Sequence, residues 1–353
     1  MIRILMCSTS RSEKGGMNSV IDQLMDHNWS KEYQFSYLAT HISGNTLKKS
    51  IYFINSYIKL FYLLVRDKFD IIHIHMSYKG SFYRKYYISR LCKKYNKKVI
   101  IHLHGSEFKD FYNSGTGKLK EKIQKLFTIA DTTIVLGNDW DKFLHNIVPQ
   151  ASVSVINNAI ALPKFEPRVQ HHPIRLLFMG ALIKRKGIVD LISAVKNISD
   201  DSIEPFELWI AGTGEDEKKL KEFSKQCGVD EKVKFLGWIN RDAKPQLLKE
   251  TDVLVLPSYN EGLPIAILEA MSYGLPIISS DVGSISEAVE VGKSGYLFQP
   301  GNTDTLSQCL KQIISDERKY EEFSKNSRRI AEEKFSDTIF FSKVEALYKK
   351  LST

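Results

Sequence analysis

Short apolar runs alternate with helix-forming stretches along almost the whole chain, and this alternation constrains the fold more than any other feature. The runs cover residues 2–7, 71–75, 99–104, 133–136 and 154–156 in the first half, and 175–179, 207–211, 233–236, 253–257 and 276–279 in the second. Runs rich in β-branched residues, each followed by a helical pattern, indicate parallel strands buried on both faces. The sequence therefore predicts an α/β protein with doubly wound, Rossmann-like sheets.

Three prolines within residues 162–173 separate the two sets of runs. Proline favours extended backbone at its own and the preceding position, so this stretch is predicted to be a linker. We predict a first domain over residues 1–168, a second over 169–335, and a C-terminal helix over 336–353 that crosses back to the first. Ligands of doubly wound domains bind at the carboxyl ends of the strands, so we expect the two domains to face each other across a cleft.

The charge is distributed unevenly over the 353 residues. The whole chain carries a net charge of +9, but residues 1–170 contain 25 basic and 13 acidic side chains, against 25 and 28 in residues 171–353. A basic first half suggests an anionic partner, such as a membrane surface, a phosphorylated acceptor or nucleic acid. The basic residues are not interleaved with aromatic ones on a nucleic-acid-binding module, so we expect no nucleic-acid partner.

No uncharged run approaches the roughly 20 apolar residues of a membrane span, and the opening run is too short for a signal peptide. We therefore expect a cytoplasmic protein. The four cysteines, Cys7, Cys92, Cys227 and Cys309, are isolated from one another. Their spacing supports neither a zinc site nor a disulfide framework, so we expect no metal and no other cofactor.

Two turns after predicted strands carry residues suited to phosphate binding. Gly15 and Gly16 follow the first run and precede a helical pattern. Their backbone N–H groups could approach an anion at the helix N-terminus, although a plain flexible turn is the alternative. Gly180 opens a later turn that contains Lys184, Arg185 and Lys186. These cations could clamp a diphosphate, or they could form a solvated basic turn.

Two glutamates, eight positions apart, give the most informative pattern. Glu261 lies in a glycine- and proline-rich turn, and Glu269 lies in a helix predicted to begin near Pro264. Apolar residues flank Glu269 on that helix. A carboxylate on a buried face is costly unless it is paired or bound to a ligand, and ribose hydroxyls are suitable ligands.

These residues resemble the family 4 glycosyltransferases, which are retaining enzymes with the GT-B fold. The resemblance is carried by the two glutamates with seven residues between them, and by residues 276–287, Gly212 with Gly214, 235–238, and Gly15 with Gly16. It is dense over residues 175–300 and thinner over the first domain. Residues 70–75, 81–85 and 102–108 resemble the branch that builds bacterial surface polysaccharides, such as O-antigen and capsule.

The resemblance implies transfer of a hexose, with retention, from a nucleotide-sugar, more commonly a UDP-sugar, to a lipid-linked glycan acceptor. Lys186 and Arg185 would hold the diphosphate, Glu261 the sugar hydroxyls and Glu269 the ribose, while His104 would lie against the sugar. The donor would also contact Gly15, Gly16, Gly180, Gly212, Trp238, Gly262, Leu263 and Pro264. The family often has arginine where this chain has Ala181. Arg185 could supply the missing guanidinium.

Two other functions remain open. A hydrolysing nucleotide-sugar epimerase shares the fold but would need a different acid–base set and would lack the paired glutamates. An inactive scaffold docked on a membrane is suggested only by Ala181. A donor-hydrolysis assay distinguishes the scaffold from an enzyme.

Two basic stretches in the first half predict peripheral docking on the anionic inner face of the plasma membrane. Residues 47–66 are rich in aromatic and aliphatic side chains, with four cations and no acid, and residues 84–98 also lack an acid. Both could form amphipathic helices with a basic face, the second through Arg84, Lys85, Lys93, Lys94, Lys97 and Lys98. The alternative is a helix packed in the core with a solvated basic edge.

Overall fold

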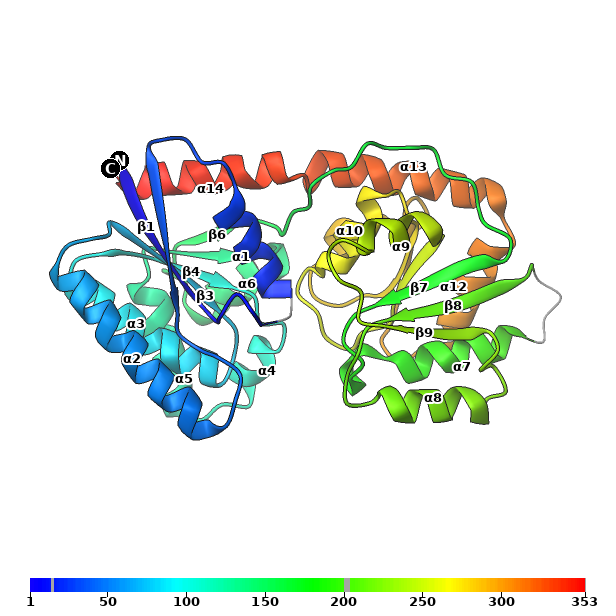
Figure 1. The fold of residues 1–353 in the computed structure, drawn as a ribbon, viewed down its shortest axis with the longest axis horizontal. Helices are drawn as coiled ribbons and strands as arrows, with labels where there is room; N and C mark the ends of the chain where they lie inside the picture. The colour runs from blue at the N-terminus through cyan, green and yellow to red at the C-terminus, as the bar shows by residue number, and fades with distance from the viewer. Residues whose placement is uncertain (14–15, 200–203, 353) are drawn as a thin grey trace. The chain divides into compact units, whose positions relative to one another are not determined.

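The computed structural model describes residues 1–13, 16–199 and 204–352, and it divides into two compact units (Figure 1). The first unit comprises Met1–Asn158 and Thr338–Thr353, and the second comprises Ala159–Asp337. The last helix of the chain therefore belongs to the first unit, although the residues before it belong to the second.

A parallel six-stranded sheet, in the order β2-β1-β3-β4-β5-β6, forms the centre of the first unit. Its strands are β1 (Ile2–Ser8), β2 (Tyr33–Ala39), β3 (Ile71–Met76), β4 (Lys98–Leu103), β5 (Thr132–Val135) and β6 (Val153–Val155). Its helices are α1 (Gly16–Asp26), α2 (Thr46–Val65), α3 (Gly80–Lys94), α4 (Phe108–Asn113), α5 (Gly117–Ile129), α6 (Asn138–Ile147) and α14 (Asp337–Ser352).

Helices cover both faces of this sheet, as the unbroken apolar runs require. Figure 1 shows α2, α3 and α5 side by side on one face, where Phe82, Ile101 and Leu126 are fully buried in one apolar cluster. On the other face lies α14, whose Tyr348 hydroxyl is 2.7 Å from Nδ1 of His73 on β3. This buried bond fastens the C-terminal helix to the centre of the sheet.

The second unit repeats the architecture with a parallel six-stranded sheet in the order β12-β11-β10-β7-β8-β9. Its strands are β7 (Ile174–Met179), β8 (Phe206–Ala211), β9 (Val233–Gly237), β10 (Val253–Leu256), β11 (Ile277–Ser280) and β12 (Gly295–Phe298). Its helices are η1 (Lys184–Lys186), α7 (Ile188–Ser199), α8 (Glu217–Gln226), α9 (Lys244–Glu250), α10 (Ile265–Ser272), α11 (Ile285–Ala288), α12 (Thr303–Ile314) and α13 (Glu317–Lys334).

The strand order reverses direction once in each sheet, and these reversals mark where ligands bind. The reversal lies between β1 and β3 in the first sheet and between β7 and β10 in the second. Loops leaving the two strands at such a point diverge to opposite faces and open a crevice at the carboxyl ends. The loops after β7 and β10 contain the predicted cations and Glu261, respectively.

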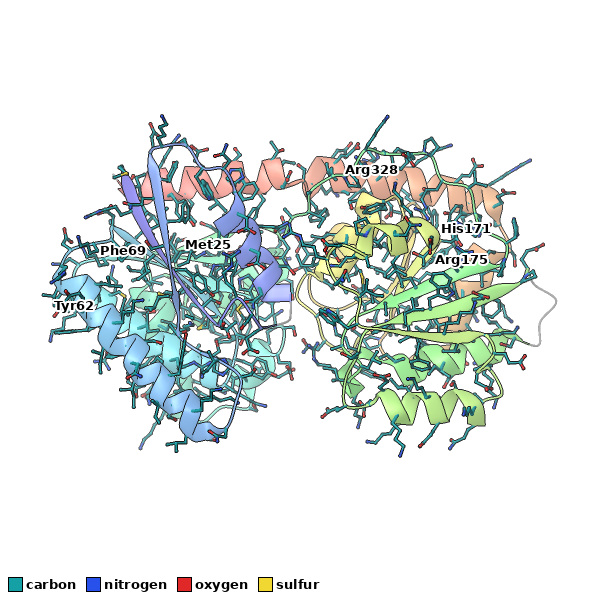
Figure 2. The ribbon with its side chains drawn as sticks, viewed as in Figure 1. Met25, Tyr62, Phe69, His171, Arg175 and Arg328 are labelled. Atoms are coloured by element: carbon teal, nitrogen blue, oxygen red, sulfur yellow. The ribbon has the colours of Figure 1, made fainter. Side chains whose placement is uncertain are left out.

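The proline-rich stretch predicted to be a linker packs against the second unit. His171 Nδ1 lies 2.8 Å from the carboxylate of buried Asp252, and the Arg328 guanidinium lies 5.4 Å from the centre of the Phe165 ring. Figure 2 labels His171 and Arg328. Arg168 adds hydrogen bonds to several backbone carbonyls of the same unit. The stretch contains neither helix nor strand, and its side chains hold it on the surface of the second unit.

The ten predicted strands are confirmed, each with ends within one residue of the prediction. The two strands that the sequence did not reveal, β2 and β12, each lie at an edge of a sheet. The prediction of one amphipathic helix with a basic face over residues 84–98 was wrong. α3 ends at Lys94, Lys85 and Lys97 are buried, and Lys93 is 2.7 Å from Asp131. These three lysines are buried or paired with an acid, so they do not form a basic outer face.

Candidate active site

The loop after β8 approaches the loop after β7 so closely that it needs glycine. A Cβ on Gly212 would lie 1.8 Å from the carbonyl oxygen of Gly180, and one on Gly214 would lie 2.2 Å from that of Leu182. The backbone also joins these loops, since Leu182 N donates to Thr213 O at 3.0 Å. The predicted residues Gly180 and Gly212 are therefore brought together at the carboxyl ends of β7 and β8.

The basic turn is a single 3-10 turn, η1, that ends at Gly187. Gly187 has φ +66°, and a Cβ there would lie 2.0 Å from the carbonyl oxygen of Pro257, the residue after β10. The absence of a side chain lets the two loops touch. Arg185 extends the contact, because its Nη1 donates to Asn260 O at 3.0 Å and its carbonyl accepts from Tyr259 N at 2.8 Å.

Lys186 and Glu261 form an ion pair at the reversal of strand order. Lys186 Nζ contacts Oε1 of Glu261, and both side chains are largely buried. The backbone of Glu261 also packs closely on Gly283, where a Cβ would lie 2.2 Å from the Glu261 carbonyl oxygen. Two of the predicted catalytic residues thus meet, and each neutralises the other's buried charge.

Glu269 has a lysine partner of its own. It lies on α10, whose residues Leu268 and Met271 are fully buried, and its carboxylate is 2.5 Å from Nζ of Lys244 at the start of α9. Burial raises the pKa of Glu269, and Lys244 opposes that shift. Nothing in the sequence pointed to Lys244, because no motif links a residue of the preceding helix to this glutamate. Gly262 and Leu263 are buried in the turn before α10, and Pro264 caps it.

Trp238 follows β9 and is 48% exposed. The turn is linked to the loop after β8, because Gly212 N donates to Gly237 O at 2.7 Å. In the first unit, Gly16 is the first residue of α1 and is exposed, whereas Gly15 lies outside the described residues. The Asn18 side chain closes that loop by donating to Ser10 O at 2.9 Å.

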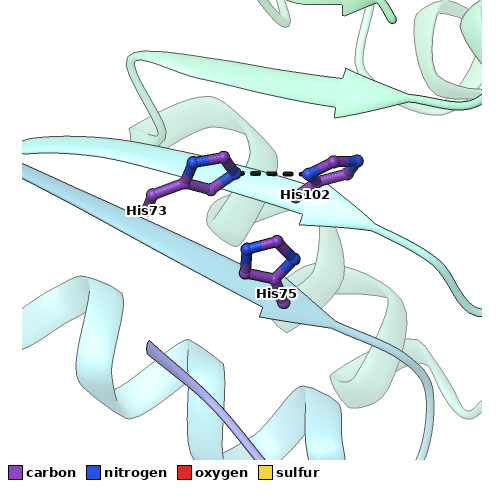
Figure 3. Close-up of side chains that lie close together, drawn as sticks. All are labelled: His73, His75 and His102. Atoms are coloured by element: carbon purple, nitrogen blue, oxygen red, sulfur yellow. Dashed lines mark hydrogen bonds between the residues drawn. The ribbon is translucent and has the colours of Figure 1, made fainter. Parts of the chain in front are cut away.

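His104 follows β4 and is the half-buried member of a column of four histidines, of which His73 and His75 lie on β3 and His102 on β4. Nδ1 of His75 lies 2.9 Å from Nε2 of His104, and Nε2 of His73 lies 3.2 Å from Nδ1 of His102 (Figure 3). Burial lowers the pKa of His73 and of His104 to about 3. The imidazoles are therefore neutral at pH 7, and each hydrogen-bonded neighbour fixes a tautomer.

His73, His75 and His102 are also the candidate metal ligands of the described residues, with ligand nitrogens within 4.8 Å of one another. The rings of His73 and His75 are stacked with planes 10° apart. Both nitrogens of His73 have hydrogen-bond partners, whereas Nε2 of His102 has none within the described structure.

Comparisons with known proteins agree with this arrangement. Residues 162–330 match the model of the glycosyl transferases group 1, and residues 26–163 match that of Glycosyltransferase Family 4. The chain is 30% identical over 313 residues to a UDP-Gal:alpha-D-GlcNAc-diphosphoundecaprenol alpha-1,3-galactosyltransferase of Escherichia coli, covering 83% of this chain and 78% of that protein. It is 25% identical to the amylovoran biosynthesis glycosyltransferase AmsK of Erwinia amylovora, covering 80% and 70%.

Solved structures show the same fold. The sucrose-phosphate synthase of Thermosynechococcus elongatus superposes with a TM-score of 0.82 at 17% identity, covering 99% of both chains. HepE of Anabaena, solved in complex with UDP, superposes with a TM-score of 0.77 at 18% identity, covering 99% of this chain and 100% of that one. Both predictions, of the GT-B fold and of a glycosyltransferase, are confirmed: this chain belongs to family 4 of the glycosyltransferases.

Proposed function

We propose that this glycosyltransferase transfers a hexose from a UDP-sugar, with retention, to a lipid-linked acceptor at the inner face of the plasma membrane. The ion pair of Lys186 with Glu261 at the reversal point of the second sheet carries the proposal. The pair places a cation and a carboxylate on two loops that touch. A cation can bind a diphosphate, and a carboxylate can accept hydrogen bonds from sugar hydroxyls.

Donor binding would exchange the partners of this pair. Lys186 would turn to the diphosphate, and Glu261 would accept hydrogen bonds from the hydroxyls of the sugar. Arg185 already donates to Asn260 O and has further N–H groups for the phosphates. It could therefore replace the arginine that is missing at position 181, where this chain has Ala181. Glu269, with its charge balanced by Lys244, would accept from the ribose hydroxyls.

The chemical step needs no separate base. The acceptor oxygen forms a bond to the anomeric carbon on the face from which the diphosphate leaves. As the bond from that carbon to the phosphate oxygen breaks, the phosphate oxygen takes the proton of the acceptor hydroxyl. Catalysis then depends on holding the two substrates and on stabilising the charge of the leaving UDP, which is the role of Lys186 and Arg185. No metal is needed where two cations do this.

The substrates are proposed from the relatives. The E. coli relative is named for a UDP-galactose donor and a diphosphoundecaprenol-linked acceptor, and solved structures of HepE contain UDP or UDP-glucose. Incubation of the purified protein with a panel of UDP- and GDP-sugars and a lipid-diphosphate-linked sugar tests the proposal. We expect transfer from a UDP-hexose in the presence of EDTA, with an α-linked product from an α-linked donor by proton NMR.

Four outcomes would contradict the proposal. A β-linked product would overturn retention, and a strict requirement for a divalent ion would overturn the metal-free step. Release of a free 2-epimeric sugar without an acceptor would instead identify an epimerase. Failure to hydrolyse or transfer any donor would favour the inactive scaffold.

The membrane part of the proposal rests on α2. Of the helices in the described part of the chain, none combines the length and apolar character that crossing a bilayer requires. An apolar stripe on α2 remains uncovered, and each of its residues is 47–69% exposed: Leu47, Ile51, Ile54, Ile58, Phe61 and Val65. Tyr62, labelled in Figure 2, is half exposed on the same helix. The opposite side of α2 packs on the unit through Leu60 and Leu64.

An anionic bilayer is the occupant that fits this stripe. The helix and its last cap carry Lys48, Lys49, Lys59 and Arg66 and no acid, so two copies packed along the stripe would bring only like charges together. A phospholipid surface accepts the apolar side chains and attracts the cations at once.

Flotation with phosphatidylglycerol vesicles, compared with phosphatidylcholine vesicles, tests the stripe. We expect the double substitution Ile51→Ser and Ile58→Ser to abolish binding, while Val291→Ser, an exposed apolar change in the second unit, leaves it intact. Equal binding of the double variant would place the docking surface elsewhere. A concentration-dependent dimer that the double variant disrupts would identify a second copy as the occupant.

A further inference from the structure

In the part of the chain that the structure describes, the first unit contains positive charges that no acid balances. Arg84, on the first turns of α3, has a buried Nε without a hydrogen-bond partner, and it forms no ion pair within the described residues. Its neighbour Lys85 is 1% exposed, and Nζ donates to Thr40 Oγ1 rather than to a carboxylate. Burying charge without a counter-ion is costly, so an arrangement of this kind is expected where an anion binds.

A lysine and an imidazole complete the group, which we name the cation cluster: His41, Lys49, Arg84 and Lys85. Burial lowers the pKa of His41 first, and Arg84, Lys49 and Lys85 lower it further, which places all three within electrostatic range of this ring. His41 is held in position by Thr9, whose Oγ1 lies 3.2 Å from Nδ1. Burial likewise lowers the pKa of Lys85 to about 7.

Within the described residues, the one acid that acts on the cation cluster is already engaged. Glu13 raises the pKa of His41, but less than Arg84 and Lys49 lower it. Its carboxylate accepts from Ser43 N at 2.6 Å and from the Ser43 hydroxyl. Glu13 therefore orders the loop after β2 and leaves the guanidinium of Arg84 uncompensated.

The cluster lies where a doubly wound sheet binds ligands. Thr40, which holds Lys85, follows β2, and its hydroxyl donates to the carbonyl of Ser8 at the end of β1 at 2.7 Å. Gly80 leaves room for Arg84, since a Cβ there would lie 3.2 Å from Nη1. The cluster thus lies at the carboxyl ends of β1 and β2, beside the reversal between β1 and β3.

We propose that the cation cluster binds a phosphate or diphosphate group, with Arg84 in contact and Lys85 supplying positive potential from behind. Arg84 offers a forked set of N–H donors that matches phosphate oxygens. Arg84 and Lys49 both act electrostatically on His41. Resting on the proposed function, this assigns the cluster to the diphosphate of a lipid-linked acceptor. A phospholipid headgroup offers the same chemistry, and the experiment separates the two sources.

Calorimetric titration of the full chain with inorganic pyrophosphate tests the site, in saturating UDP so that the donor loops are occupied. We expect binding that Arg84→Gln weakens at least tenfold and that Arg90→Gln, an exposed change on the same helix, leaves unchanged. Arg84→Lys should retain part of the affinity. Absence of binding by the native protein, or equal binding by Arg84→Gln, would overturn the proposal. This titration does not depend on sugar transfer, so it stands if the proposed function fails.

A second variant, Lys85→Met, distinguishes loss of the binding site from loss of folding. Removing an uncompensated buried amine should raise Tm while weakening pyrophosphate binding, whereas a merely structural lysine would lower Tm when replaced. The hydroxyl of Thr40 keeps its bond to Ser8 in this variant. A lower Tm together with unchanged affinity would contradict the assigned role.

Two assays identify the source of the phosphate. If it is the acceptor's, Arg84→Gln raises KM at least tenfold for a diphosphate-linked sugar but not for the same sugar on a neutral alkyl chain. If it is a headgroup's, the variant instead loses binding to phosphatidylglycerol vesicles and keeps its KM for detergent-dissolved acceptor. A variant that is unchanged in both assays would overturn the site.

Discussion

Acidification from pH 7 to pH 5 should destabilise the first unit through its histidine column. An unfolded histidine titrates near pH 6.5, whereas burial lowers the pKa of His73 to about 3 in the folded protein. Below pH 6.5 the unfolded chain therefore binds more protons than the folded one. The stabilisation is fully present above pH 6.5 and is lost as the pH falls towards 3.

The magnitude follows from the two pKa values. For one histidine with a folded pKa near 3, the free energy of unfolding falls by about 2 kcal/mol between pH 7 and pH 5. His75 and His102 contribute with the same sign, because burial also lowers their pKa values well below the ordinary value. Since a typical domain is stable by about 5–15 kcal/mol, the column should dominate the acid sensitivity of this unit.

Hydrogen exchange of peptides from β3 and β4 in a urea series, at pH 7 and at pH 5, measures this change for the first unit alone. His73→Gln should reduce the loss between the two pH values by about 2 kcal/mol. His145→Gln, a change at an exposed histidine of α6, should leave the loss unchanged. If the native protein and His73→Gln lose equal stability, His73 is not a source of the acid sensitivity.

Three substitutions in the second unit test the active-site assignment. Glu269→Gln should weaken UDP binding by about 1–3 kcal/mol in calorimetry, because a charged acceptor is lost, and unchanged binding would remove Glu269 from the site. Lys186→Ala should lower kcat more than it raises KM, since the charge on the leaving group grows in the transition state; a change in KM alone would assign Lys186 to ground-state binding. Gly187→Ala should destabilise the protein by more than about 1 kcal/mol in urea unfolding, whereas Gly117→Ala, with open space around it, should not.

The fold was predictable because most of its strands are apolar runs buried on both faces. Such a run is visible in the sequence without knowledge of the residues that pack against it. β2 was missed because it is an edge strand in which only Tyr33 and Leu38 are buried. The two glutamates were predictable from their spacing, but only one of the two lysines that pair with them was. Lys186 stood in a basic turn, whereas Lys244 meets Glu269 only through the packing of α9 beside α10.

The basic stretch at residues 84–98 shows the limit of charge patterns. Its cations are adjacent in the sequence but do not share one surface, because α3 ends at Lys94 and the mostly buried Lys97 pairs with the exposed Asp67. A count of charges cannot distinguish a solvated lysine from a buried one, whereas the apolar stripe of α2 follows helical periodicity and could be placed on a helix in advance.

The pairing of Lys186 with Glu261 joins segments 75 residues apart, and this separation has a consequence during protein synthesis. A ribosome that adds about 5–20 residues per second needs about 4–15 s to extend the chain from one partner to the other. During that interval the basic turn can form neither its ion pair with Glu261 nor its contact with the loop after β10. UDP should therefore stabilise only chains in which the second unit is nearly complete, so nucleotide-dependent protease resistance of stalled nascent chains would report when this unit closes.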